Sequence, residues 1–182
     1  MQEIKLEKVE HLAELKPQDI NIKPQGEITK EMAEDIFGKL MESEYLDEVE
    51  SKWSKEIMDA IGSRAEYDIY EKAELQEYEI DGRKCLIRND IDWNQKDMMG
   101  RTNQERANQG LSPLNKDGKI IELHHIGQHA DSPLAELTPE EHRGKGNDNI
   151  LHDKTKESEI DRQIFAVERN GHWEARANER SV

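Results

Sequence analysis

Two adjacent histidines mark the segment of this sequence that is best suited to hydrolytic chemistry. The segment Glu122-Leu123-His124-His125 reads as the end of a short strand. Successive side chains of a strand point to opposite faces of the sheet, so His124 and His125 cannot share one face. One imidazole can therefore bind a cation while the other activates water. The pattern indicates metal-assisted hydrolysis, with a pair of ordinary surface histidines as the alternative.

Two further histidines are candidates to complete a metal site. His142 lies on the first turn of a predicted helix, and His152 lies ten residues further on, beyond a Gly144–Gly146 segment able to bend the chain back. Three neutral imidazoles with one open position favour zinc or another late divalent ion, because magnesium prefers oxygen ligands. We therefore expect one bound divalent ion, zinc first, with magnesium, manganese and nickel as alternatives in catalysis.

Helices that must support these residues follow from the apolar periodicity. Helical spacing predicts helices over 30–42, 43–61, 63–73, 101–109 and 155–179. The last of these has a candidate break at Asn170-Gly171. A further helix is expected to begin at Thr138-Pro139, because threonine, proline and a glutamate three residues on form a capped helix start.

Strands are fewer. The alternating segment 76–88 contains Asp81-Gly82, a strong hairpin signal. Residues 119–125 are apolar and β-branched enough for a strand, and 134–137 are its candidate partner. The fold class is therefore α+β, mostly helical, with little sheet.

The net charge of −15 is unevenly distributed and divides the chain. Residues 1–80 hold 22 acidic and 10 basic side chains, whereas residues 81–182 hold 19 and 16. Six of the seven histidines lie beyond residue 120. We predict three parts: a flexible linker over 1–28, an acidic helical extension over 29–75 and a catalytic domain over 76–182. An acidic chain is a poor non-specific binder of nucleic acid, because phosphate affinity comes from lysine and arginine. The whole-chain charge alone would therefore indicate an acidic binding protein that mimics nucleic acid.

Several protein classes are excluded by the sequence. No apolar run approaches the ~18 residues that a membrane span requires. Residues 1–30 lack the cationic start and apolar core of a signal peptide. The single cysteine, Cys85, excludes an internal disulfide framework and a cysteine-rich zinc cluster, and its place in a predicted strand indicates a core residue.

The motif order in this region resembles a known nuclease superfamily. The sequence ELHH at 122–125, followed by Thr138-Pro-Glu-Glu-His142 and then His152, is similar to the HNH/endonuclease VII superfamily. Within it, the chain resembles the toxin nucleases named for a Leu-His-His motif, over about residues 76–176. The resemblance implies a ββα-metal core, in which two short strands and a helix surround one divalent cation at the scissile phosphate.

The resemblance also implies a role for each histidine. His125 is similar to the general base that deprotonates the attacking water. His124 and His142 are similar to the first two metal ligands. His152 is similar to the last ligand, but this chain inserts RGKGNDNIL before it, and Asn149 is the alternative.

Other positions correspond less directly to the family pattern. Glu122 is similar to the carboxylate that orients neighbouring groups, and we count it among the catalytic residues. Arg101 and Arg106 are candidate phosphate clamps, with a solvated helix face as the alternative. The asparagine that holds the loop between the strands has no match, and Asp131 or Ser132 stands near its place.

The family implies a largely non-sequence-specific DNase toxin used in competition between bacteria. Such a toxin is the C-terminal piece of a larger secreted or surface-delivered protein, acts in the cytoplasm of the target cell and is neutralised by a cognate immunity protein. We expect this chain to be such a piece. An RNase that uses the same site and a non-catalytic histidine–metal interaction module are the alternatives.

Overall fold

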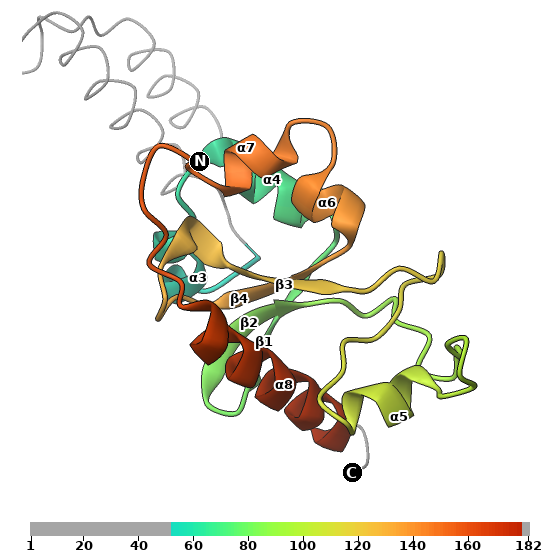
Figure 1. The fold of residues 1–182 in the computed structure, drawn as a ribbon. Helices are drawn as coiled ribbons and strands as arrows, with labels where there is room; N and C mark the ends of the chain where they lie inside the picture. The colour runs from blue at the N-terminus through green and yellow to red at the C-terminus, as the bar shows by residue number, and fades with distance from the viewer. Residues whose placement is uncertain (1–51, 180–182) are drawn as a thin grey trace, which may run out of the picture. The chain divides into compact units, whose positions relative to one another are not determined.

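The computed structural model describes residues 52–179, and these belong to one compact unit, Ser51–Val182 (Figure 1). The predicted linker over 1–28 and the predicted helix over 30–42 lie outside the described residues. No helix among residues 52–179 is long and apolar enough to cross a membrane. Helices α3 (Lys55–Ala60) and α4 (Arg64–Lys72), which the sequence analysis assigned to the acidic extension, belong to this unit.

Two of the predicted helices can be compared with α3 and α4 over the described residues. The helix predicted over 43–61 is helical among the described residues only from Lys55, because Ser54 has an extended backbone. Trp53 therefore precedes the helix, and its indole N–H donates to the Leu75 carbonyl at 3.2 Å. The α4 helix agrees with its prediction and is capped by Ser63, which accepts from the Glu66 backbone N–H.

Four strands form one small sheet in the order β1-β2-β4-β3. Their bounds are β1 Gln76–Ile80, β2 Arg83–Ile87, β3 Glu122–His125 and β4 Leu134–Leu137. The predicted hairpin is confirmed: β1 and β2 pair antiparallel across Asp81-Gly82, both with positive φ. The predicted pairing of residues 134–137 with the histidine strand is also confirmed: β3 and β4 pair antiparallel, but β3 begins at Glu122 and not at residue 119.

A parallel pairing that the sequence did not predict joins the two strand pairs. Cys85 of β2 lies opposite Leu134 of β4, and Leu86 lies opposite Ala135. All four side chains are almost fully buried, so the hairpin and the ββα unit share one sheet and one core. This pairing leaves β3 at the edge of the sheet.

Helices cover both faces of the sheet (Figure 1). One face carries α8 (Arg162–Glu179) and α5 (Asn103–Ala107), and its core centres on Trp173 of α8. The predicted break at Asn170-Gly171 is wrong, because α8 continues through it. The predicted start at 155 is also wrong: Asp161 accepts from two backbone N–H groups of the first turn and so begins the helix.

The other face carries α4, α6 (Pro139–Arg143) and α7 (Asn147–Leu151) (Figure 1). The predicted start of α6 is confirmed by a complete capping box between Thr138 and Glu141. Strands β3 and β4 followed by α6 form the expected ββα arrangement, and the fold is α+β as predicted. Helix α7 was not predicted; it follows Gly146, whose φ of +95° turns the chain back toward the sheet.

Candidate metal centre and catalytic cleft

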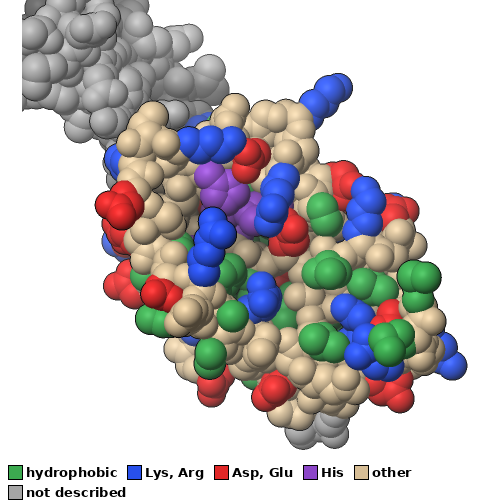
Figure 2. Space-filling model, viewed as in Figure 1, with side chains coloured by type: hydrophobic (Ala, Val, Ile, Leu, Met, Phe, Trp, Pro, Cys, Tyr) green, Lys and Arg blue, Asp and Glu red, His purple; other side chains and the backbone are tan. Residues whose placement is uncertain are grey.

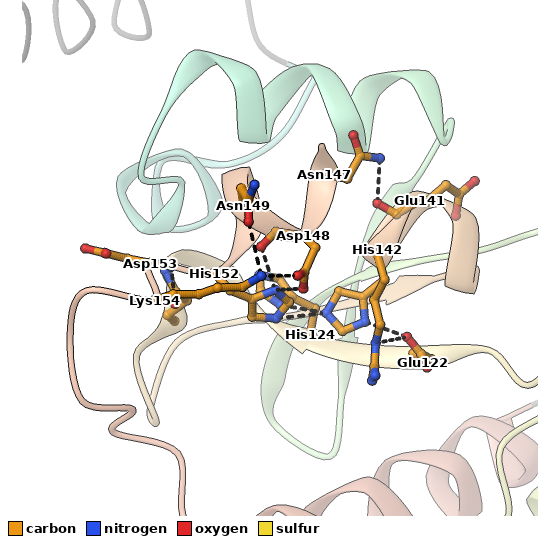
Figure 3. Close-up of polar contacts among 12 residues, drawn as sticks. Glu122, His124, Glu141, His142, Asn147, Asp148, Asn149, His152, Asp153 and Lys154 are labelled. Carbon is orange, nitrogen blue, oxygen red and sulfur yellow. Dashed lines mark hydrogen bonds and ion pairs between the residues drawn. The ribbon is translucent and has the colours of Figure 1, made fainter. Parts of the chain in front are cut away.

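Three histidines from three elements converge on one point (Figure 3). His124 comes from β3, His142 from α6 and His152 from the end of α7. The Nε2 atom of His142 lies 3.2 Å from His124 Nδ1 and 3.2 Å from His152 Nε2. Two nitrogens bound to one tetrahedral zinc ion lie about 3.3–3.4 Å apart, given a Zn–N distance of about 2.0–2.1 Å. The spacing fits a single ion.

The opposite nitrogens of these rings face oxygen atoms. His142 Nδ1 lies 2.7 Å from Glu122 Oε2, and His152 Nδ1 lies 3.1 Å from the Asp148 carbonyl oxygen. His124 Nε2 lies 3.8 Å from Glu66 Oε1. Oxygen acceptors place the ring proton on the outer nitrogen, so the inner nitrogens present lone pairs to one another. Three converging lone pairs lack a donor between them, and a cation satisfies all three.

Burial keeps these rings in the form that binds metal. Burial, and after it the neighbouring His124 imidazole, lowers the pKa of His142 to about 4. Burial also lowers the pKa of His152. Both imidazoles are therefore neutral near pH 7, which is the state required of a metal ligand. These three histidines could hold a metal ion.

His125 lies on the opposite face of β3, as the alternation predicted. Its Nε2 atom lies 2.9 Å from Glu168 Oε2 of α8, and its ring contacts Phe165, with ring centroids 4.7 Å apart. Burial, and after it the charges of Arg83 and His124, lowers the pKa of His125 to about 4. A neutral His125 that donates its Nε2 proton to Glu168 keeps Nδ1 as an acceptor. This is the arrangement expected of a base.

Both faces of the edge strand contribute to one cleft of about 670 Å³. His124, His142 and His152 line it from one side and His125 from the other, because no further strand covers β3. The metal cluster and the spare imidazole therefore face the same space.

Arginines surround this cleft, and Figure 2 shows basic side chains gathered around the histidines. Arg143, Arg162 and Arg169 line it. Arg143 pairs with Glu122 at 3.1 Å, and the Arg169 guanidinium lies 6.0 Å from the Phe165 ring centroid. Within residues 52–179, no carboxylate forms an ion pair with Arg162 or Arg169. The two guanidinium groups are thus available to an anionic ligand.

The two arginines chosen from the sequence are not brought to the cleft. Arg101 and Arg106 both bind the Asp97 carboxylate at 2.8 Å, and Arg106 also donates to the Ser112 carbonyl. They hold the loop before α5 in place, and neither lines the cleft. Sequence spacing could not show that Asp97 folds back onto both.

The remaining sequence-based candidates are also placed. His152 lies in the cluster, whereas Asn149 accepts a hydrogen bond from Lys154 at 3.1 Å (Figure 3). Glu122 Oε2 lies 2.7 Å from His142 Nδ1, and its role as an orienting carboxylate stays a prediction. In the loop between β3 and β4, the Ser132 hydroxyl donates to the His129 carbonyl at 2.8 Å.

Four groups near the site were missed by the sequence analysis: Glu66, Arg162, Glu168 and Arg169. Glu66 left one signal, since it lies one turn before Tyr70 on the apolar stripe of α4, where a carboxylate is unusual. Arg162, Glu168 and Arg169 lie in a charged helix with no local feature to distinguish them.

A comparison with family models finds a match over the region that holds the four histidines of the cleft. Residues 102–179 match the model described as a nuclease of the HNH/ENDO VII superfamily with conserved LHH. Residues 102–179 belong to this family. The LHH domain so defined contains the ββα unit and α8, but α4 and the β1–β2 hairpin lie before it. Family membership indicates a nuclease, whose substrate is a nucleic acid. No solved structure matches the chain.

Proposed function

We propose that this protein is a metal-dependent endonuclease that hydrolyses DNA with little sequence preference. The observation that carries the proposal is the spare imidazole of His125, which faces the same cleft as a three-histidine cluster. A purely structural histidine site would enclose its metal and leave no neighbouring base. The cleft of this LHH domain contains both a three-histidine cluster and a further imidazole, and this combination favours a catalytic role over a non-catalytic interaction module.

Each residue has a defined task in this mechanism. His124, His142 and His152 would hold a divalent ion, with zinc the first candidate for a site of three nitrogens. When bound there, such an ion would supply positive charge for a phosphate oxygen and for the leaving oxygen. His125 accepts a proton from the attacking water at Nδ1, while Glu168 holds the ring in place from Nε2. No residue in this scheme reads a base.

The proposed biological context is competition between bacteria. The ELHH region resembles toxin nucleases, which are delivered from outside, act in the cytoplasm of the target cell and are neutralised by a cognate immunity protein. We extend both the delivery and the immunity partner to this chain on that resemblance. Co-purification with, and inhibition by, a small protein encoded beside it would test the partner directly.

One assay separates the candidate activities. The purified protein is incubated with plasmid DNA and, separately, with structured RNA, in EDTA and after addition of zinc, magnesium, manganese or nickel. We expect metal-dependent cleavage of DNA that EDTA abolishes. Cleavage of RNA alone would replace the DNase by an RNase that uses the same site. Failure to cut either substrate with any of the four ions would contradict an enzymatic function.

The cleft arginines give a prediction about binding. Replacing Arg162 and Arg169 together with alanine is expected to weaken DNA binding and lower the slope of log affinity against log salt by about 1.8, because each phosphate contact contributes about 0.9. Fluorescence anisotropy with labelled duplex DNA in EDTA measures this without cleavage. Arg101→Ala is the matched control, since Arg101 binds Asp97 and lies outside the cleft. If Arg101→Ala lowered the salt dependence of DNA binding and the double variant did not, Arg101 would again be the candidate phosphate clamp.

A further inference from the structure

Glu66 is a buried carboxylate beside the metal cluster, and it comes from outside the LHH domain. It lies on α4, and only 3% of its surface is exposed. Its Oε1 atom lies 3.8 Å from His124 Nε2, on the side of that ring opposite the converging nitrogens. Glu66 thus stands toward His124 as Glu122 stands toward His142.

Neighbouring donors fix this carboxylate in one position. Glu66 Oε1 accepts from the Tyr70 hydroxyl at 2.5 Å and from the Gly127 N–H at 3.0 Å. Its Oε2 atom accepts from the Gly62 N–H at 2.8 Å. Gly127 lies two residues beyond the end of β3, and a Cβ atom there would clash with the Ala60 carbonyl oxygen. The segment that joins α3 to α4 therefore packs tightly against the residues that follow His125.

The charge of Glu66 has no fixed counterpart in the described residues. Its hydrogen-bond donors are the Tyr70 hydroxyl and the backbone N–H groups of Gly62 and Gly127, all of them neutral groups that stabilise a carboxylate. No lysine or arginine among residues 52–179 forms an ion pair with it. A buried carboxylate without a cationic partner is costly. The basic side chain that the described residues place beside it is His124, whose Nε2 lies 3.8 Å away and has no hydrogen-bond partner there.

A metal on His124 would resolve both features. A metal-bound imidazole carries its proton on the outer nitrogen and becomes a stronger donor toward a carboxylate. A carboxylate lies at the outer nitrogen of each imidazole: Glu122, Asp148 and Glu66. Arg143 pairs with Glu122 and Lys154 pairs with Asp148, so the charge of a divalent ion would be opposed chiefly by Glu66. His124 Nε2 is a donor without a hydrogen-bond partner, and Glu66 is a carboxylate without a cationic partner. The two groups therefore complement each other.

We propose that Glu66 is a positioning residue of the metal centre, which orients His124 and balances the charge of the bound ion. The working nuclease therefore includes α4 as well as the LHH domain. This inference rests on the metal site of the proposed function.

Zinc affinity of the metal-free, full-length protein tests the role of Glu66. Competition with a chromophoric chelator measures the affinity, and thermal unfolding of the metal-free protein measures stability separately. Glu66→Gln keeps the volume and one acceptor but removes the charge, and we expect a loss of about 10–100-fold in zinc affinity. Glu66→Asp keeps the charge and is expected to recover part of this loss.

Tyr70→Phe is the matched control. It removes one hydrogen bond to the same carboxylate and leaves its charge, so zinc affinity should stay within about threefold of the parent even where stability falls. Equal losses of affinity in Tyr70→Phe and Glu66→Gln would assign the effect to packing of α4 and overturn the proposal. Unchanged zinc affinity in Glu66→Gln would overturn it as well, while the parent still binds zinc. A parent protein that binds no metal would instead contradict the proposed function itself.

Discussion

Replacing His125 with alanine is expected to abolish cleavage while metal binding and the fold remain. General-base catalysis contributes about 100-fold to 10,000-fold in rate, and His125 is the imidazole of the cleft that is not in the metal cluster. The substitution should not unfold the protein, because Glu168 keeps its ion pair with Arg83 after His125 is removed. The rate of plasmid nicking at saturating metal measures the loss.

A histidine in the following loop provides the control for this variant. His129 is exposed, pairs with Glu159 and lies outside the cleft. His129→Ala should therefore nick plasmid at the parental rate. Metal titration of His125→Ala decides the assignment: an affinity equal to the parent's agrees with a base, whereas a lost affinity would show that His125 is itself a ligand.

Local sequence signals predicted the β1–β2 hairpin, strand β3 and the start of α6, but not α7. The Asp81-Gly82 turn and the Thr138–Glu141 capping box depend on neighbouring residues alone, and both appear in the structure as expected. The parallel pairing of β2 with β4 depends on residues about 50 positions apart and leaves no local pattern. Helix α7 is five residues long, too short for periodicity to reveal, yet it brings His152 back to His142.

The sequence likewise predicted only part of the candidate site. Histidines in a known motif order could be named from the sequence, and the structure brings His124, His142 and His152 together. The charged groups around the histidines could not be named in this way, because an arginine's role depends on which carboxylate folds against it. Asp97 occupies Arg101 and Arg106, whereas Arg162 and Arg169 line the cleft with no acidic partner in residues 52–179.

The acidic character of the chain acquires a different meaning at the cleft. Glu122 and Glu66 face the outer nitrogens of the metal cluster, and Glu168 faces His125. These carboxylates lie behind the histidines and orient them, while the arginines border the space where a phosphate must bind. Negative charge can therefore support nucleic-acid hydrolysis when it is held one layer away from the substrate.

Replacing His142 with alanine is expected to disable the metal site itself. His142 Nε2 lies 3.2 Å from both other ligand nitrogens, so its loss leaves only two of the three imidazole ligands. Zinc affinity should fall by more than the ~100-fold that removal of an outer partner costs, and cleavage should fall with it. Chelator competition on the metal-free variant measures the affinity.

The neighbouring arginine separates loss of the ligand from disturbance of α6. Arg143→Ala removes the other partner of Glu122 from the same helix but leaves all three imidazoles. It should bind zinc with an affinity close to the parent's and lose only DNA affinity, because its exposed guanidinium borders the cleft. His142→Ala differs from it in one respect, the lost ligand nitrogen. An unchanged zinc titration in His142→Ala would therefore refute the three-histidine site, since no other ligand group stands between His124 and His152 in the described chain.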